Sequence, residues 1–346
     1  MRPKVCGRIP ESIFRMSKLL EKRNSIYGAC ALWVILFHTQ RRIPTPYIPV
    51  ISNIIGIGNI AVDIFFFFSG LCLSLSASKH DYANSGWGNY FKRRFTRVLL
   101  PYLIICIPFY LWAAAFESSG SFAARAAAFF ANISSVSFWL KGTQTTWFVY
   151  GILVFYIVFP LIYTFVKNRG IVQSGCLLLG FVLFAVLTAY LPILNNSMIV
   201  WARLPIFTIG VISGTEYFGK IKPTKPSLII AAAVAVPLGW LTSVSELSET
   251  FTIPQVYRWL LYIPITLSLM LLLSQFGKKI KILEWVGGLS LEVYLIHVTM
   301  LHPLKHYGVM DAVGYWLYII LPAAALLSAA VVWMIEKWLL KQGVRA

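Results

Sequence analysis

The stretch SIYGACALWVILFHT (Ser25 to Thr39) decides the fold, because it is the first strongly apolar run of the chain and its penultimate residue is His38. Arg23 stands just before it. At 1.5 Å per residue, the eleven steps from Tyr27 to His38 cover roughly 16 Å, about half the hydrocarbon thickness of a bilayer. Arg23, Tyr27 and His38 then share one helix face. The stretch predicts either a polar track leading to a buried basic histidine or an ordinary membrane helix with polar ends.

Composition restricts the class of protein. Of the 346 residues, 58% are hydrophobic and only 12% are charged, too few polar groups to cover a soluble domain. The five cysteines show no CxxC spacing, so we expect no metal site. The sequence predicts an all-α, polytopic membrane helix bundle. We expect about ten transmembrane helices, at 25–40, 56–78, 98–116, 146–166, 171–192, 200–216, 227–245, 256–275, 284–302 and 314–336.

Charge predicts the topology. The net charge of +18 is scattered over short loops, which disfavours a nucleic-acid partner. Most of the Lys and Arg residues fall in alternate loops, and the positive-inside rule then places both termini in the cytoplasm. We expect a basic tail at 1–24, one membrane domain at 25–336 and a second basic tail at 337–346. The lipid bilayer is the expected partner of the apolar surface.

A single carboxylate, Asp63, stands in the apolar run IAVDIFFFFSG (Ile60 to Gly70). An acid at bilayer depth is costly unless it has a partner inside the bundle. One interpretation is that Asp63 accepts a hydrogen bond from His38 and supports the imidazolium that forms when the histidine takes a proton. The alternative is an ion pair with Arg203 or Arg258 that only joins helices.

A basic segment, YFKRRFTRVLLPYLI (Tyr90 to Ile104), leads into the third apolar run. Arg94 and Arg97 are three residues apart, so they lie on neighbouring faces of one helical turn. Together they can hold a phosphate-bearing ligand at the cytoplasmic surface. Anchoring to anionic lipid headgroups is the alternative.

Several stretches, in this order and spacing, resemble the acyltransferase 3 family of integral membrane acyltransferases. They span almost the whole chain. The stretches are FH at the end of the first run, VDIFFFFSG, RRFTRVLLPY, TWFVYGILVFYIVFPLI, RLPIFTIGVISG and LSLEVYLIH.

The resemblance implies acyl transfer, usually of acetyl, from cytoplasmic acyl-CoA to a carbohydrate hydroxyl on the far side of the membrane. His38 matches the essential histidine of the family, and Arg94 with Arg97 matches its RxxR element for the acyl donor. Members commonly carry Arg or Lys eleven residues before the histidine, where this chain has Tyr27. Arg23 lies one turn earlier and is the expected replacement.

Other polar or aromatic residues are candidates for binding the acceptor. His297 is either a second catalytic histidine or a satisfied core histidine, and Glu292 lies five residues before it. Arg203 can contact the acceptor or anchor a helix at the interface. Trp147 and Tyr150 can stack on a sugar or belong to the aromatic belt.

The sequence thus predicts a bacterial inner-membrane O-acetyltransferase. Acetyl-CoA is the expected donor, a cell-surface polysaccharide or its lipid-linked precursor is the expected acceptor, and His38 is the expected general base. A glycan transporter or flippase is the alternative, because it would also carry polar residues inside membrane helices. The sequence does not decide whether the chain forms a homo-oligomer.

Overall fold

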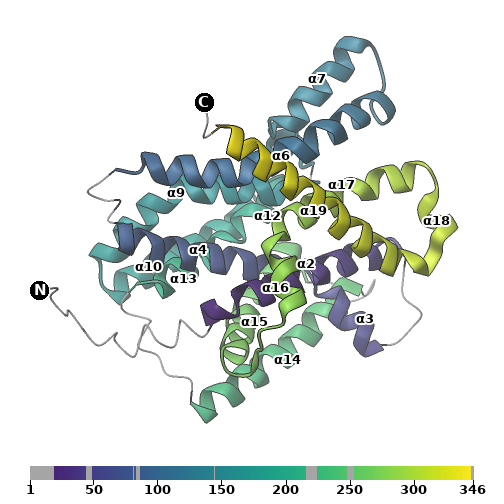
Figure 1. The fold of residues 1–346 in the computed structure, drawn as a ribbon. Coiled ribbons are helices and arrows are strands. Elements are labelled where there is room, and N and C mark those ends of the chain that lie inside the picture. Colours follow the sequence, from purple (N-terminus) through teal and green to yellow (C-terminus); the bar gives the residue numbers. More distant parts are fainter. Residues whose placement is uncertain are drawn as a thin grey trace, which may run out of the picture.

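Every regular element in the part of the chain that the structure describes is a helix (Figure 1). The computed structural model describes residues 19–43, 49–80, 82, 86–143, 145–215, 224–247 and 253–343. The longer helices are α2 (Arg23–Gln40), α4 (Ile60–His80), α6 (Gly88–Phe116), α7 (Phe122–Ile133), α9 (Trp147–Asn168), α10 (Ile171–Thr188), α13 (Leu204–Ser213), α14 (Lys225–Leu247), α15 (Gln255–Phe276), α17 (Ser290–His306) and α19 (Leu317–Gly343). Shorter helices are α3 (Pro49–Gly56), α8 (Val136–Lys141), α11 (Pro192–Asn195), α12 (Met198–Trp201), α16 (Lys281–Gly288), α18 (Val309–Val313) and η2 (Gly314–Trp316).

The predicted all-α polytopic bundle is confirmed. Within the described residues, seven helical segments are long and apolar enough to cross a membrane. They lie on α4, α6, α9, α10, α14, α15 and the run from α18 through α19. The pair α16 and α17, bent by 70° at Leu289, makes an eighth if it is counted as one span.

Two further predicted spans are helical but are not among the segments that are both long and apolar enough to cross a membrane. The run at 25–40 forms α2, whose 18 residues extend about 27 Å. The run at 200–216 forms the broken pair α12 and α13. The count of about ten spans stays a prediction, as does the side of the membrane on which each terminus lies.

Some predicted boundaries move. The run at 56–78 forms α4, which begins only at Ile60, after the turn that follows α3. The predicted tail at 337–346 is not separate from the last span, because α19 continues without a break to Gly343. Of the predicted tail at 1–24, residues 1–18 lie outside the described residues, and α2 already begins at Arg23.

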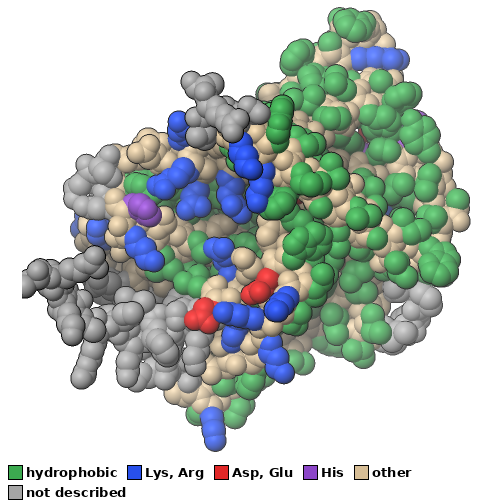
Figure 2. Space-filling view, in the orientation of Figure 1, with side chains coloured by type: hydrophobic (Ala, Val, Ile, Leu, Met, Phe, Trp, Pro, Cys, Tyr) green, Lys and Arg blue, Asp and Glu red, His purple; other side chains and the backbone are tan. Residues whose placement is uncertain are grey.

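The surface divides into two kinds of area. Hydrophobic side chains cover most of one side of the view in Figure 2, whereas Lys and Arg side chains gather on the other. Helix α7 projects from the body of the bundle (Figure 1) and buries none of its residues. Apolar side chains are among those that it exposes, and Phe122 is 88% exposed. An apolar surface of this extent matches the predicted bilayer environment.

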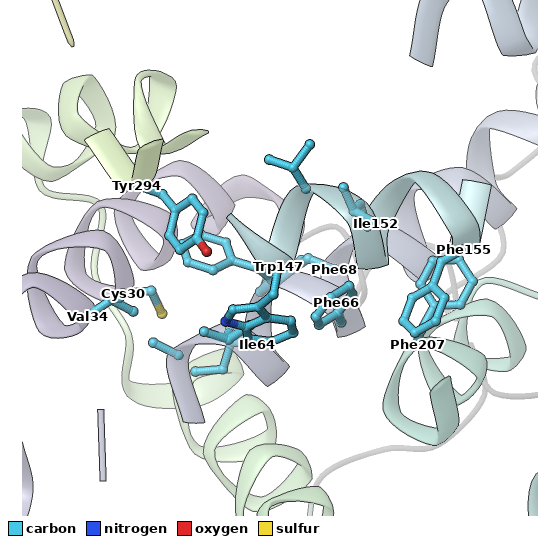
Figure 3. Packing of buried hydrophobic residues seen from close by; sticks show 14 of the residues in the cluster. Cys30, Val34, Ile64, Phe66, Phe68, Trp147, Ile152, Phe155, Phe207 and Tyr294 are labelled. Carbon is cyan, nitrogen blue, oxygen red and sulfur yellow. The ribbon is translucent and has the colours of Figure 1, made fainter. Parts of the chain in front are cut away.

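Aromatic rings in tilted contact join α4, α9 and α13 in the buried core. Phe66 lies between Trp147 and Phe155, with ring centroids 6.3 and 5.0 Å away (Figure 3). Phe155 in turn contacts Phe207 at 5.1 Å. Each such pair contributes about 0.5–1.5 kcal/mol beyond its buried area. These ring contacts therefore hold the start of α9, where Trp147 lies, against α4.

Two helix crossings require glycine. A Cβ atom at Gly28 of α2 would lie 2.0 Å from the Leu283 carbonyl oxygen, and one at Gly287 of α16 would lie 1.9 Å from the Asn24 carbonyl oxygen. The crossing of α4 and α13 is equally close at Gly70. Because van der Waals packing drives helix association in membranes, the backbones can approach this closely only without side chains.

We expect Gly287→Ala to destabilise the protein, because the new methyl group must push α16 away from α2. Overpacking of this kind costs about 1–3 kcal/mol. The thermal midpoint in detergent, followed by size-exclusion chromatography, measures the effect. Gly180→Ala is the matched control, since nothing lies within 4 Å of its added Cβ. Equal midpoints for the two variants would show that the close crossing does not stabilise the bundle.

Candidate active site

A cavity of about 440 Å³ lies at the first turn of α2, and we call it the Arg97 cavity. It is lined by all four residues that the sequence predicted for the acyl donor: Arg23 and Tyr27 from α2, and Arg94 and Arg97 from α6. The structure thus brings these four residues to one cavity, and their role in binding an acyl donor stays a prediction. Three guanidinium groups around one cavity favour a ligand with several negative charges.

The break between α16 and α17 forms another part of this cavity. Gly287, Gly288 and Ser290 line it, and Ser290 is the first residue of α17. The first N–H groups of a helix lack partners within that helix and carry a partial positive charge. The N-terminus of α17 therefore adds backbone donors to the three arginines on the cavity wall.

The side chain of Arg23 is held at this cavity by its neighbours. Its Nη1 donates to Cys72 Sγ at 3.5 Å, and its Nε and Nη2 donate to Asn24 Oδ1. The guanidinium carbon lies 5.8 Å from the centre of the Tyr27 ring. Arg23 thus places a positive charge beside Tyr27, where the family commonly has a basic residue, and its role in binding stays a prediction.

A second cavity, of about 540 Å³, lies at the opposite end of α2. We call it the His38 cavity. Its walls combine His38, Arg41 and Arg42 with aromatic faces of Trp147 and Tyr294. The remaining lining residues are Thr145, Val298, Leu301 and His302. A histidine, two arginines and two aromatic rings around one space suit a polar ligand with a ring-shaped apolar face.

His38 has a second histidine as its neighbour. The ring centroids of His38 and His297 are 5.3 Å apart. The Nδ1 atom of His297 lies 3.1 Å from the Val293 carbonyl oxygen, which can only accept, so Nδ1 carries the proton. Its Nε2 is buried and has no hydrogen-bond partner among the described residues. His297 therefore presents an unpaired acceptor inside the bundle next to His38.

Tyr294 separates the two cavities and is the one residue, among those described, that lines both. Its ring lies 5.2 Å from the Phe148 ring, which faces the Arg97 cavity, and 5.6 Å from the His297 ring. Figure 3 shows Tyr294 in the same buried cluster as Trp147 and Cys30. An unbroken series of rings thus leads from the Arg97 cavity through Tyr294 and His297 to His38.

The predicted hydrogen bond between His38 and Asp63 is wrong. Asp63 pairs with Arg203, with 3.8 Å between Oδ2 and Nε, and both side chains are fully buried. Neither oxygen of Asp63 makes a hydrogen bond within the described residues. The reason is helix packing, because α4 crosses α13 closely and brings the carboxylate to Arg203. The alternative interpretation of Asp63, a pair that joins helices, is the one that the structure confirms.

Three candidates for acceptor binding lie away from His38. Arg203 is fully buried, with its guanidinium carbon 4.4 Å from the centre of the Trp259 ring and 5.3 Å from that of Trp147. The hydroxyl of Tyr150 belongs to a buried hydrogen-bond network with Tyr102, Tyr110 and Thr146. Neither side chain lines a cavity described above.

Glu292 also lies outside the cavity that contains His38. It lines a third cavity, of about 550 Å³, whose wall includes Arg97, Trp333 and Glu336. Arg97 lines both this cavity and the Arg97 cavity. Glu292 therefore lies near the predicted donor-binding residues. Of the candidates for the acceptor, Trp147 and His297 remain beside His38.

The sequence interpretation missed Arg41, Arg42 and Tyr294. The two arginines directly follow the motif FHTQ, at the end of α2 where positive charge is disfavoured if the N-terminus is cytoplasmic. This departure from the positive-inside rule could have marked the two arginines as functional candidates. Tyr294 has no such mark in the sequence, because a tyrosine in an apolar run is typical of an ordinary core residue. No group of three or more His, Cys, Asp and Glu residues able to hold a metal ion occurs in the described ranges.

Comparison with known proteins identifies a family. The acyltransferase 3 model, described as an acyltransferase domain, matches residues 28–336, nearly the whole chain. The match includes every site residue described above except Arg23, Asn24 and Tyr27. No curated protein and no solved structure matches the chain.

We expect Asp63→Asn to destabilise the bundle, because it leaves the Arg203 guanidinium without its counter-charge. Breaking a buried ion pair costs about 3–5 kcal/mol in soluble proteins. Thermal midpoints of Asp63→Asn, Arg203→Met and the double variant form a cycle that isolates the pair. The double variant should be more stable than either single variant. Strictly additive losses would show that the two residues do not act as a pair.

Proposed function

Since the chain belongs to the acyltransferase 3 family and is a membrane acyltransferase, we propose that it moves an acetyl group from cytoplasmic acetyl-CoA to a hydroxyl of a cell-surface polysaccharide or its lipid-linked precursor. The proposed setting is a bacterial inner membrane. Family membership removes the support for a transporter. One observation carries the proposal: three arginines surround one cavity, His38 lines another, and Tyr294 lies between them.

The proposed donor site is the Arg97 cavity. Coenzyme A carries three phosphate groups, and Arg23, Arg94, Arg97 and the N-terminus of α17 provide complementary charge and donors. Its extended pantetheine arm is narrow and partly apolar. The wall of this cavity also includes apolar residues, among them Phe65, Phe148 and Ile152. The arm would lead the thioester toward Tyr294.

The proposed acceptor site is the His38 cavity. A sugar hydroxyl is a weak nucleophile near neutral pH, so a positioned base accelerates its attack. His38 takes the hydroxyl proton as the oxygen attacks the thioester carbonyl. The C–O bond of the ester forms, the C–S bond breaks, and the coenzyme A thiolate receives a proton. For this step the thioester end of the donor must pass beside Tyr294 into the His38 cavity, where it meets the hydroxyl. Holding both substrates there supplies the proximity that this reaction needs.

His297 is proposed as the partner of His38. With its proton on Nδ1, its Nε2 can accept a hydrogen bond from His38 or a proton from the site. This assigns to His297 the orienting role that the sequence suggested for Asp63. Trp147 offers a flat face on the cavity wall for the sugar ring.

The proposal predicts that substitutions in the two cavities affect different steps: those in the His38 cavity lower acetyl transfer, and those in the Arg97 cavity weaken coenzyme A binding. His38→Ala should lower acetyl transfer by about 100-fold or more, the usual contribution of a general base, and leave coenzyme A affinity unchanged. Arg94→Ala and Arg97→Ala should each weaken coenzyme A binding about tenfold, because each removes a charge-assisted hydrogen bond. Radiolabelled acetyl-CoA in membrane vesicles measures transfer, and calorimetry on purified protein measures affinity.

Arg169→Ala is the matched control for this pair of measurements. Arg169 follows α9, is exposed, and lines none of the three cavities. It should change neither value. Normal transfer by His38→Ala, or normal coenzyme A affinity in both arginine variants, would contradict the proposal. Loss of an ester from surface glycans when the gene is deleted would identify the acceptor.

Tyr294→Ala should uncouple the reaction, because it removes the ring between the two cavities and admits water to the thioester. We expect coenzyme A release without matching ester formation. Tyr294→Phe keeps the ring and should therefore release free coenzyme A and form ester in equal amounts. The ratio of free thiol to labelled ester measures the coupling. A ratio for Tyr294→Ala equal to that of Tyr294→Phe would show that the ring is not a barrier.

A further inference from the structure

The third cavity, of about 550 Å³, carries charges of both signs. Besides Arg97, three cations from α6 and α19 line it together with two carboxylates: Lys92, Arg93, Lys337, Glu292 and Glu336. The proposed reaction uses none of these five residues. A site with cations and carboxylates suits a ligand that is itself zwitterionic, because each end of that ligand meets an opposite charge.

The two glutamates lack close partners inside the protein. Glu292 is 8% exposed, and no side chain among the described residues forms a hydrogen bond or an ion pair with its carboxylate. Oε1 of Glu336 is buried and likewise has no hydrogen-bond partner within those residues. The two carboxylates lie within electrostatic range of each other and of Arg97, which also lines the Arg97 cavity. Because burying an unpaired carboxylate is costly, the pair favours an occupant that brings a cation with hydrogen-bond donors.

We propose that the third cavity binds the headgroup of phosphatidylethanolamine, in which a primary ammonium is joined to a phosphate. The ammonium donates hydrogen bonds to Glu292 and Glu336, and its three N–H groups are enough to serve both carboxylates. The phosphate lies against the cations of the same wall, Lys92, Arg93 and Lys337. This lipid site does not depend on the proposed acyl transfer.

Tryptophans place the cavity at the level of the lipid headgroups. Trp333 lines it and is 39% exposed, and Trp338 on the same helix is 60% exposed. Exposed tryptophans gather at membrane interfaces, because the ring is apolar and its N–H group is polar. The Nζ atom of Lys337 lies 3.6 Å from the centre of the Trp333 ring, so its charge is at the same level. Lipids are concentrated there, which favours a lipid headgroup as the occupant.

An apolar track for the acyl chains leads away from the cavity along α6. Leu100 lines the cavity, and Leu103 and Ile107 follow it at helical spacing on the same face. These two side chains are 42% and 38% exposed. Helix α19 packs against α6, so the headgroup site lies where two membrane-facing helices meet.

The test compares lipids that differ only in the headgroup. Full-length protein, freed of lipid in detergent, is mixed with equal amounts of phosphatidylethanolamine, phosphatidylcholine and phosphatidylglycerol with the same acyl chains, and native mass spectrometry measures which lipid is retained. We expect phosphatidylethanolamine to be retained about tenfold better than phosphatidylcholine, whose trimethylated ammonium has no N–H group to donate. Phosphatidylglycerol keeps the phosphate but lacks the ammonium, so it should also be retained less well than phosphatidylethanolamine.

Glu292→Gln/Glu336→Gln should abolish this preference, because neutral amides do not attract an ammonium, and the retention ratio of phosphatidylethanolamine to phosphatidylcholine should fall to about one. Glu21→Gln is the matched control, since Glu21 is 57% exposed and lines none of the three cavities. It should keep the preference of the unmodified protein. Thermal midpoints show whether each variant is folded.

Equal retention of phosphatidylethanolamine and phosphatidylcholine by the unmodified protein overturns the proposal without any variant. A preference that survives in Glu292→Gln/Glu336→Gln overturns it too. Coenzyme A affinity is measured on the same samples. If the double variant loses that affinity while its lipid preference is unchanged, the cavity belongs to the donor and the lipid proposal is wrong.

Discussion

Close backbone contact between α2 and α16 is the constraint on which both cavities depend. Gly28 and Gly287 leave no room for a side chain, so the first half of α2 lies directly against the helix that precedes the break. This contact helps to place Arg23 and Ser290 on the wall of the same cavity, the Arg97 cavity. Because α2 is a single uninterrupted helix, fixing its start also fixes His38 about 22 Å further along the axis. Membrane helices gain nothing from hydrophobic exclusion against each other, so shape at a few glycines decides the arrangement.

The second constraint is the bend between α16 and α17. Irregular backbone inside a membrane is tolerated where it lines a polar cavity rather than lipid, and here it lines two. From this bend α17 runs along all three cavities, with Ser290 at the Arg97 cavity, Glu292 at the third and Tyr294 shared with the His38 cavity. One helix therefore connects the proposed donor phosphates to the proposed base, and its fixed rise per residue sets the separation between the two chemical tasks.

Hydropathy and charge were sufficient to predict the helices and to group the basic residues that line the Arg97 cavity, since hydropathy and charge can both be read along the chain. Arg94 and Arg97 could be placed with Arg23 because each marks the same end of its helix. The partner of Asp63 could not be predicted, because that depends on which helix crosses α4, and the crossing at Gly70 is a property of tertiary packing. The same reason explains Tyr150: its sequence position predicts an interface residue, but the neighbouring Tyr102 and Tyr110 of α6 bury its hydroxyl in a network.

Assigning Asp63 to Arg203 changes the electrostatics expected of the reaction. A histidine that takes a proton inside a membrane protein becomes a cation in a medium of low dielectric, and it needs an opposite charge or solvent. His297 is neutral in the tautomer that its backbone contact fixes, so it can share the proton but cannot neutralise it. In the proposed reaction the proton must therefore leave His38 soon after it arrives. The coenzyme A thiolate that forms when the C–S bond breaks is the group that can take it, so the same step that produces the cation also produces the base that discharges it.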